Sequence, residues 1–180
     1  MTASIRALHR SNAHTFSKAD EPFVTLLTGL GVDGDAHCGS TVKHRSRVAI
    51  DPSQPNLRQV HLLSEEILDA LNAHGYRLRP GDLGENITTM GVDLHALPTG
   101  TLLRLGDSAL IALTGLRNPC RQIETFRDGL VRQVAFKDPD GNVVRRAGVM
   151  AIVIQGGGIH RGDLIVAQLP PPPHTALARV

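Results

Sequence analysis

Glycine and proline divide this chain into short segments. The 180 residues include 18 glycines and 11 prolines, a density that favours short elements joined by turns. Between these breaks lie seven runs rich in Val, Ile, Leu or Thr, which we predict to be strands: 24–27, 59–63, 86–89, 101–105, 109–114, 149–154 and 164–169. Short strands at this spacing favour a mainly β fold, with a closed or nearly closed barrel, over a doubly wound sheet.

Two helical segments interrupt the predicted strands. The first covers 65–74, because Ser64 is a good N-cap, acidic residues occupy the first turn and a glycine follows the last. The second begins near Cys120, with Asn118 as its predicted N-cap, and restarts over 129–136. The sequence thus predicts a β protein with a few short helices.

The chain is predicted to consist of one domain with two flanking segments. Residues 1–22 form an N-terminal strand or extension, and 23–169 form the domain. Residues 170–180 are interpreted as a tail, because the four prolines at 170–173 cannot join a central strand. Residues 39–58 lack periodicity and are predicted to be a long loop, which in a compact domain is often a binding loop.

Composition argues against several classes of protein. A net charge of +2, with one Tyr and no Trp, gives neither the basic patch nor the stacking rings of a nucleic-acid-binding protein. No apolar run approaches the roughly 18 residues of a membrane helix, and the N-terminus lacks a signal-peptide core. We therefore expect a cytoplasmic protein with neither a nucleic-acid nor a membrane partner. The two cysteines form no C-x-x-C motif, which excludes a zinc ribbon or a thioredoxin motif.

Cys120 is the strongest candidate for chemistry. With Pro119 as first helical residue, Cys120 lies in the first turn, where backbone N–H groups stabilise a thiolate. Arg117 and Arg121 add positive charge on either side. A thiolate there can bind a soft metal, attack an electrophile or carry a persulfide sulfur. The alternative is that Cys120 is a small buried apolar residue.

A second candidate cluster follows the first predicted strand. Glycines between 31 and 39 allow close backbone approach to a ligand, and Asp35 and His37 offer hydrogen-bonding groups. Arg45 and Arg47 present guanidinium groups suited to phosphate. The pattern is not a nucleotide P-loop, and the spacing of the nearby His and Cys residues matches no standard closed zinc site. The alternative is a Gly/Asp turn beside a solvated basic loop.

Two further segments carry polar residues near turns. Glu85 and Asn86 follow a Pro-Gly-Asp turn and enter a predicted strand, where Asn can recognise the polar edge of a heterocycle. The alternative is a turn whose side chains bond their own backbone. The triple glycine at 156–158 could cradle a phosphate, but we interpret it as a hairpin loop before the last strand.

The order of these motifs resembles the MOSC domain, named after the C-terminal domain of molybdenum cofactor sulfurase. The resemblance covers about 23–169 and rests on Gly-x-x-Gly-Asp-Ala-His-x-Gly at 31–39, Pro-Gly-Asp-Leu-Gly-Glu-Asn-Ile-Thr at 80–88 and Pro119-Cys120. The chain looks like a stand-alone bacterial-type member. The resemblance implies a β-barrel like that of the pyruvate kinase barrel domain and a molybdenum cofactor (molybdopterin) site. It implies no pyridoxal phosphate in this chain.

The resemblance also implies roles for individual residues. Cys120 matches the family's defining cysteine, which in relatives ligates molybdenum or, in an older view, carries a persulfide. Arg45 or Arg47 would take the cofactor's phosphate. His37, Asn86 and Thr114 would face the pterin or the metal's oxo groups. The remaining residues of the expected cofactor site are Asp35, Glu85 and Arg117.

Three functions are compatible with such a site. The first is a molybdenum-dependent oxidoreductase that reduces small N-hydroxylated compounds with electrons from a donor protein. The second is a sulfur carrier served by a cysteine desulfurase. The third is a module that binds or delivers the cofactor without turnover. The sequence has too few cysteines for an iron–sulfur cluster and no flavin or haem motif, so the first function requires a separate electron donor.

Overall fold

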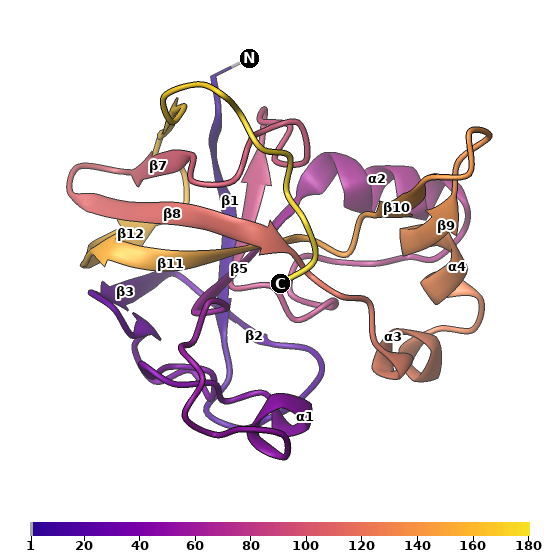
Figure 1. Ribbon diagram of the computed structural model, residues 1–180, viewed down its shortest axis with the longest axis horizontal. Coiled ribbons are helices and arrows are strands. Elements are labelled where there is room, and N and C mark those ends of the chain that lie inside the picture. The colour runs from indigo at the N-terminus through magenta and orange to yellow at the C-terminus, as the bar shows by residue number, and fades with distance from the viewer. Residues whose placement is uncertain (1) are drawn as a thin grey trace.

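A mixed eight-stranded sheet forms the centre of the protein (Figure 1). The computed structural model describes residues 2–180, apart from the side chains of Arg45 and Ser46. The strand order is β13-β7-β8-β11-β5-β6-β1-β2. In chain order the strands are β1 (Ser4–Arg10), β2 (Ala19–Glu21), β5 (Val60–Ser64), β6 (Ile87–Met90), β7 (Leu102–Leu105), β8 (Ala109–Leu116), β11 (Val149–Gln155) and β13 (Ile165–Gln168).

Smaller sheets and four helices complete the fold. A three-stranded sheet contains β3 (Phe23–Leu27), β4 (Gly31–Val32) and β12 (Gly157–His160), and a hairpin pairs β9 (Ala135–Lys137) with β10 (Val143–Arg145). The helices are α1 (Arg45–Val48), α2 (Glu65–Ala73), α3 (Arg121–Phe126) and α4 (Leu130–Val134). No described helix has the length and apolar character needed to cross a membrane. The mainly β prediction is confirmed.

The closed barrel is not confirmed, because within residues 2–180 no sheet closes on itself. The first strand does approach the last: the Ile5 N–H donates to Asp163 O, and the Ile165 N–H donates to Ala3 O. Only one isolated bridge, between Ser4 and Leu164, links the two strands. The hydrogen-bond ladder therefore does not continue around the sheet, and β2 occupies the edge beyond β1.

Local patterns explain the elements that carry the core. Residues along β8 alternate between buried and partly exposed, so one face of this strand packs inward. β5 is buried along its whole length and leads directly into α2. The chain then returns to β6, which pairs in parallel with β5, the one parallel pairing between the described strands. α2 begins and ends close to its prediction and buries Leu68 and Leu71.

Three sequence expectations are corrected by the structure. The second helix begins at Arg121, so Cys120 is its N-cap with extended backbone and does not lie in the first turn. The predicted restart over 129–136 ends early, because the chain pairs with β10 from Ala135. The triple glycine is not a hairpin loop: Gly157–His160 form β12, which pairs with β3.

Both flanking segments pack onto the domain. β1, from the predicted N-terminal extension, lies inside the main sheet between β6 and β2. After the prolines, Leu177 enters the core, and the Leu116 N–H at the end of β8 donates to Ala178 O. The loop 39–58 also folds back on itself, through α1 and a bridge between Thr41 and Pro55. The domain boundaries themselves stay a prediction.

Candidate functional site

Cys120 lines a cavity of about 410 Å³. The walls come from segments far apart in the sequence: the loop after β1, the 37–44 region, the start of β5, the Gly84–Asn86 turn and the end of β8. Of the predicted site residues, His37, Asn86, Arg117 and Cys120 line this cavity together. The structure thus brings together side chains from the three motifs that sequence analysis singled out.

Cys120 occupies the junction between β8 and α3. Its side chain is partly buried, and its thiol lies 3.5 Å from Oε1 of Gln122, in hydrogen-bonding range. Arg117, three residues earlier, donates from Nη1 to Leu83 O. Burial lowers the pKa of Arg117, and nearby Cys120 and Glu85 oppose that shift. A partly accessible thiol and a partly buried guanidinium therefore line the same cavity.

Asp35 does not itself line the cavity but contacts three side chains that do. Its side chain is almost completely buried, and its oxygens lie 2.7 Å from Nζ of Lys18, 3.2 Å from Nδ1 of His37 and 3.0 Å from Nδ2 of Asn86. Burial raises the pKa of Asp35, but the hydrogen bond from His37 and the charge of Lys18 outweigh it, so the net shift is well downward. Asp35 is consequently an anion that holds three cavity-lining side chains in place.

Imidazole rings contribute much of the remaining wall. The ring of His37 lies 4.4 Å from that of His44 and 5.0 Å from that of His14, measured between centroids. His61 is buried, and its Nε2 lies 2.9 Å from Ala147 O. Burial lowers the pKa of His44 to about 3 and lowers that of His61 well below 6.5, so both rings are neutral at pH 7. Among the described residues, no group of three or more His, Cys, Asp or Glu side chains is arranged so that it could hold a metal ion.

One buried cation, Lys18, and two partly buried ones, Arg58 and Arg117, give the cavity a positive field. Burial lowers the pKa values of Lys18, Arg58 and Arg117. For Arg58 the pKa falls to about 10, since the charges of Arg47, Arg117 and Arg179 add to the effect of burial. In the part of the chain that the structure describes, Lys18 has Asp35 as partner, whereas Arg58 donates from Nη2 to Val180 O and pairs with no side-chain carboxylate. An anionic ligand would relieve this repulsion.

Several predicted residues lie outside the cavity lining. Thr114 donates from Oγ1 to Leu57 O, 2.7 Å away. Glu85 is fully buried beneath the turn: Oε1 accepts from Gly81 N and Thr88 Oγ1, and burial raises its pKa. Arg47 does not line the cavity but contributes its charge. The Arg45 side chain, which the sequence also assigns to the site, lies outside the described residues.

The sequence analysis missed five lining residues that carry charge or an aromatic ring: His14, Phe16, Lys18, Arg58 and His61. Phe16 and Lys18 fall in the segment interpreted as an extension, and Arg58 at the end of the long loop. The sequence signal for Lys18 was weak, because an isolated lysine is normally a solvated surface residue.

The structure is that of a mainly β protein in which one cysteine and several cationic side chains line the same cavity. The MOSC domain model matches residues 34–166, and the chain therefore belongs to the MOSC domain family. No curated protein matches its sequence.

Solved structures share the fold at low sequence identity. The YuaD protein from Bacillus subtilis superposes with a TM-score of 0.78 at 24% identity, covering 95% of this chain and 98% of that one. YiiM from Geobacillus stearothermophilus superposes with a TM-score of 0.66 at 16% identity, covering 97% of this chain and 79% of that one. YiiM from Escherichia coli superposes with a TM-score of 0.62 at 19% identity, covering 97% of this chain and 73% of that one. At these identities the similarity establishes the fold.

Proposed function

We propose that this protein binds the molybdenum cofactor in the Cys120 cavity and reduces N-hydroxylated compounds with electrons from a partner protein. The observation that carries the proposal is that a partly accessible thiol lines the same cavity as three cations, Lys18, Arg58 and Arg117, of which only Lys18 has a side-chain carboxylate of the described residues within ion-pair distance. A thiolate is a suitable ligand for a soft metal, and guanidinium groups bind phosphate through paired N–H bonds. Membership of the MOSC family supports this ligand.

The residues present fit the cofactor. Arg58 and Arg117 would bind its phosphate, with Arg47 adding long-range charge. Asn86 would bond the polar edge of the pterin, and Cys120 would ligate molybdenum. When bound, the molybdenum cofactor supplies two-electron redox chemistry at an oxygen-bearing substrate.

The chain itself would supply a proton for the reduction. Conversion of an N–OH group to N–H consumes two electrons and two protons and releases water, so a proton donor beside the substrate assists the step. Nδ1 of His37 lies 3.2 Å from the Asp35 carboxylate, which leaves Nε2 free to exchange a proton with a ligand. We assign this role to His37.

The test compares cofactor content and activity in the same preparations. Protein made in a host that synthesises the cofactor should contain about one molybdenum atom per chain and reduce hydroxylaminopurine with a reduced viologen dye as donor. Cys120→Ser should abolish activity, whereas Cys38→Ser, the matched control outside the cavity lining, should retain both properties. Arg58→Gln should lower cofactor retention, and Thr114→Val should not.

Other results would identify the competing functions. Stoichiometric molybdenum without reduction of any N-hydroxylated compound would support a binding or delivery module and contradict the reductase. Cyanide-labile sulfur on Cys120, without molybdenum, would support a sulfur carrier and contradict both. Retention of the cofactor at wild-type affinity in Cys120→Ser would remove the assignment of Cys120 as metal ligand.

A further inference from the structure

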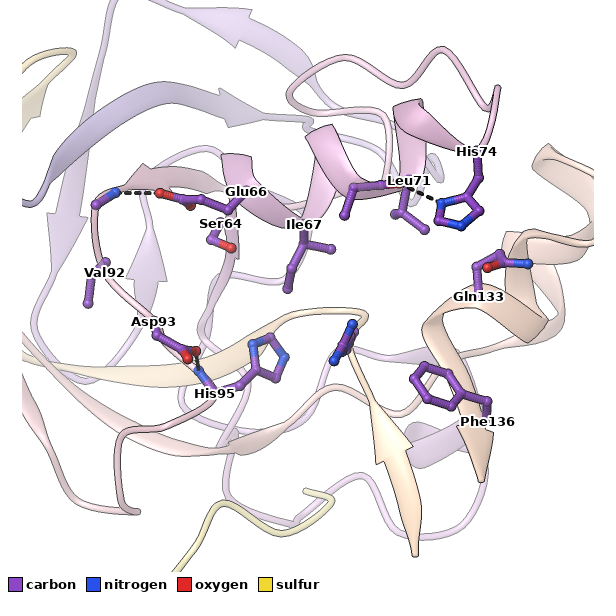
Figure 2. A pocket seen from close by; sticks show the side chains of 13 residues that line it. Ser64, Glu66, Ile67, Leu71, His74, Val92, Asp93, His95, Gln133 and Phe136 are labelled. Carbon is purple, nitrogen blue, oxygen red and sulfur yellow. Dashed lines mark hydrogen bonds between the residues drawn. The ribbon is translucent and has the colours of Figure 1, made fainter. Parts of the chain in front are cut away.

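A second cavity, of about 580 Å³, lies between α2, the segment after β6 and the β9–β10 hairpin; we call it the α2 pocket. Figure 2 shows Ile67 and Leu71 on the α2 side, with His95 and Phe136 on the other. No described residue borders both this pocket and the Cys120 cavity. Its volume lies within the range of about 300–1,000 Å³ that is typical of small-molecule sites.

The pocket has apolar walls. Ile67 and Leu71 project from α2, Val92 follows β6, and Phe136 comes from β9. Phe136 remains partly exposed and is one of only four phenylalanines in the chain. Exposed aromatic rings that border a cavity offer a flat surface against which another ring can stack. These walls favour a ligand with a flat apolar body.

One buried polar atom in the pocket lacks a partner. Nε2 of His95 is inaccessible to solvent and forms no hydrogen bond with any described residue. Burial lowers the pKa of this imidazole, which is therefore neutral at pH 7. The Asp93 carboxylate accepts from the backbone N–H groups of His95 and Ala96 and so fixes the turn that carries the ring. An unpaired buried imidazole nitrogen is an unsatisfied site that a ligand atom could complete.

Charges of both signs border the pocket. Asp93 and Glu66 are acidic, and the Arg146 guanidinium lies 5.5 Å from the centroid of the Phe136 ring. Glu66 accepts from the Gly91 N–H, and no ion pair with Arg146 is present in the described part of the chain. The lining has charges of both signs, and both carboxylates already accept hydrogen bonds from backbone N–H groups, unlike the cationic Cys120 cavity. The balance favours an uncharged ligand.

We propose that the α2 pocket binds a neutral, planar heteroaromatic molecule. Its ring packs against Ile67 and Phe136, and the imidazole of His95 turns toward the ligand so that Nε2 pairs with its hydrogen-bonding edge. The site is separate from the Cys120 cavity and does not depend on the molybdenum cofactor.

Adenine is a suitable probe, because it is neutral at pH 7 and carries adjacent donors and acceptors. An NMR titration should show saturable shifts at residues 67, 95 and 136. Ala70→Phe fills the pocket from α2 and should abolish these shifts, whereas Ala73→Phe, the same change on an exposed residue of α2 outside the lining, should bind as the wild type does. His95→Ala should weaken binding about tenfold. Benzoate and benzamidine, as charged probes, should bind at least tenfold more weakly than adenine.

Four results would overturn the proposal. The first is the absence of saturation up to the solubility limit of adenine, and the second is unchanged affinity in Ala70→Phe. The third is a set of shifts confined to His37 and Asn86, which would locate the ligand in the Cys120 cavity. Tighter binding of benzoate than of adenine would refute the preference for an uncharged ligand. The spectrum of each variant reports directly whether it is folded.

Discussion

Nζ of Lys18 lies 2.7 Å from Oδ2 of Asp35, and both side chains are nearly inaccessible, at 5% and 1% exposure. The pair joins the segment after β1 to the glycine-rich loop after β4, and Lys18 lines the Cys120 cavity. Burial lowers the pKa of Lys18, and the adjacent Asp35 charge opposes that shift. The pair thus keeps a cation in the cavity that burial alone would disfavour.

Removal of one partner should be costly. Lys18→Met leaves the buried Asp35 carboxylate without its cation, so we expect a loss of about 3–5 kcal/mol in the free energy of unfolding. Urea denaturation measures it. The double variant Lys18→Met/Asp35→Leu should recover part of the loss, since it leaves no unpaired buried charge. A Lys18→Met protein as stable as the wild type would contradict the burial of this pair.

Acidification should destabilise the protein between pH 6.5 and about 4. Burial lowers the pKa of His9 to about 4 and that of His44 to about 3, and His61 shifts in the same direction. The unfolded chain binds protons at these histidines near pH 6.5, whereas the folded chain does not. Their contribution to stability is therefore complete above pH 6.5 and is lost as the pH falls toward the folded-state values.

The slope of stability against pH tests this contribution. Each histidine that titrates only in the unfolded chain contributes up to about 1.4 kcal/mol per pH unit. His9→Leu should reduce the slope by about that amount, because His9 is buried and neither ring nitrogen has a hydrogen-bond partner among the described residues. His74→Leu, at an exposed position, should leave the slope unchanged. Equal slopes in all three proteins would argue against neutral buried histidines.

Gly148 should be essential for the position of His61. A Cβ at Gly148 would lie 2.2 Å from Nε2 of His61 and 2.5 Å from Leu62 O, and its φ of +110° is unfavourable for other residues. Gly148→Ala should cost about 3 kcal/mol through strain and overpacking. Gly158→Ala, where nothing lies within 4 Å of the added carbon, should change stability by less than about 0.5 kcal/mol. Calorimetric melting of the two variants measures the contrast.

Inorganic phosphate should stabilise the protein lacking cofactor. An anion bound beside Arg58 and Arg117 relieves their repulsion, and at ten times its Kd it adds about 1.4 kcal/mol. That corresponds to a rise of about 3–6 °C in Tm. Arg58→Gln should lose most of the rise, whereas Arg104→Gln, on exposed β7 surface, should keep it. An equal rise in both variants would indicate a non-specific salt effect.

Much of the fold follows from local sequence. The apolar run that became Val60–Ser64 and the capped segment that became Glu65–Ala73 were predictable, because strand and helix propensities depend on near neighbours. The position of Cys120 beside the start of a helix was also predictable from local sequence, although its place as the N-cap was not predicted. The motifs carrying His37 and Asn86 were identified from residue type and order, and the cavity brings them together.

The tertiary structure alone decided which other residues share that cavity. Lys18 and Arg58 gave only a weak sequence signal, since a lone cation is ordinarily solvated. Only the folding of distant segments around Asp35 and Arg117 buries Lys18 and partly buries Arg58. Thr114, predicted from its hydrogen-bonding capacity, bonds Leu57 O outside the lining. Strand β12 likewise forms because β3 is available to pair with it. Burial and pairing arise from contacts between residues far apart in the chain, which local patterns do not encode.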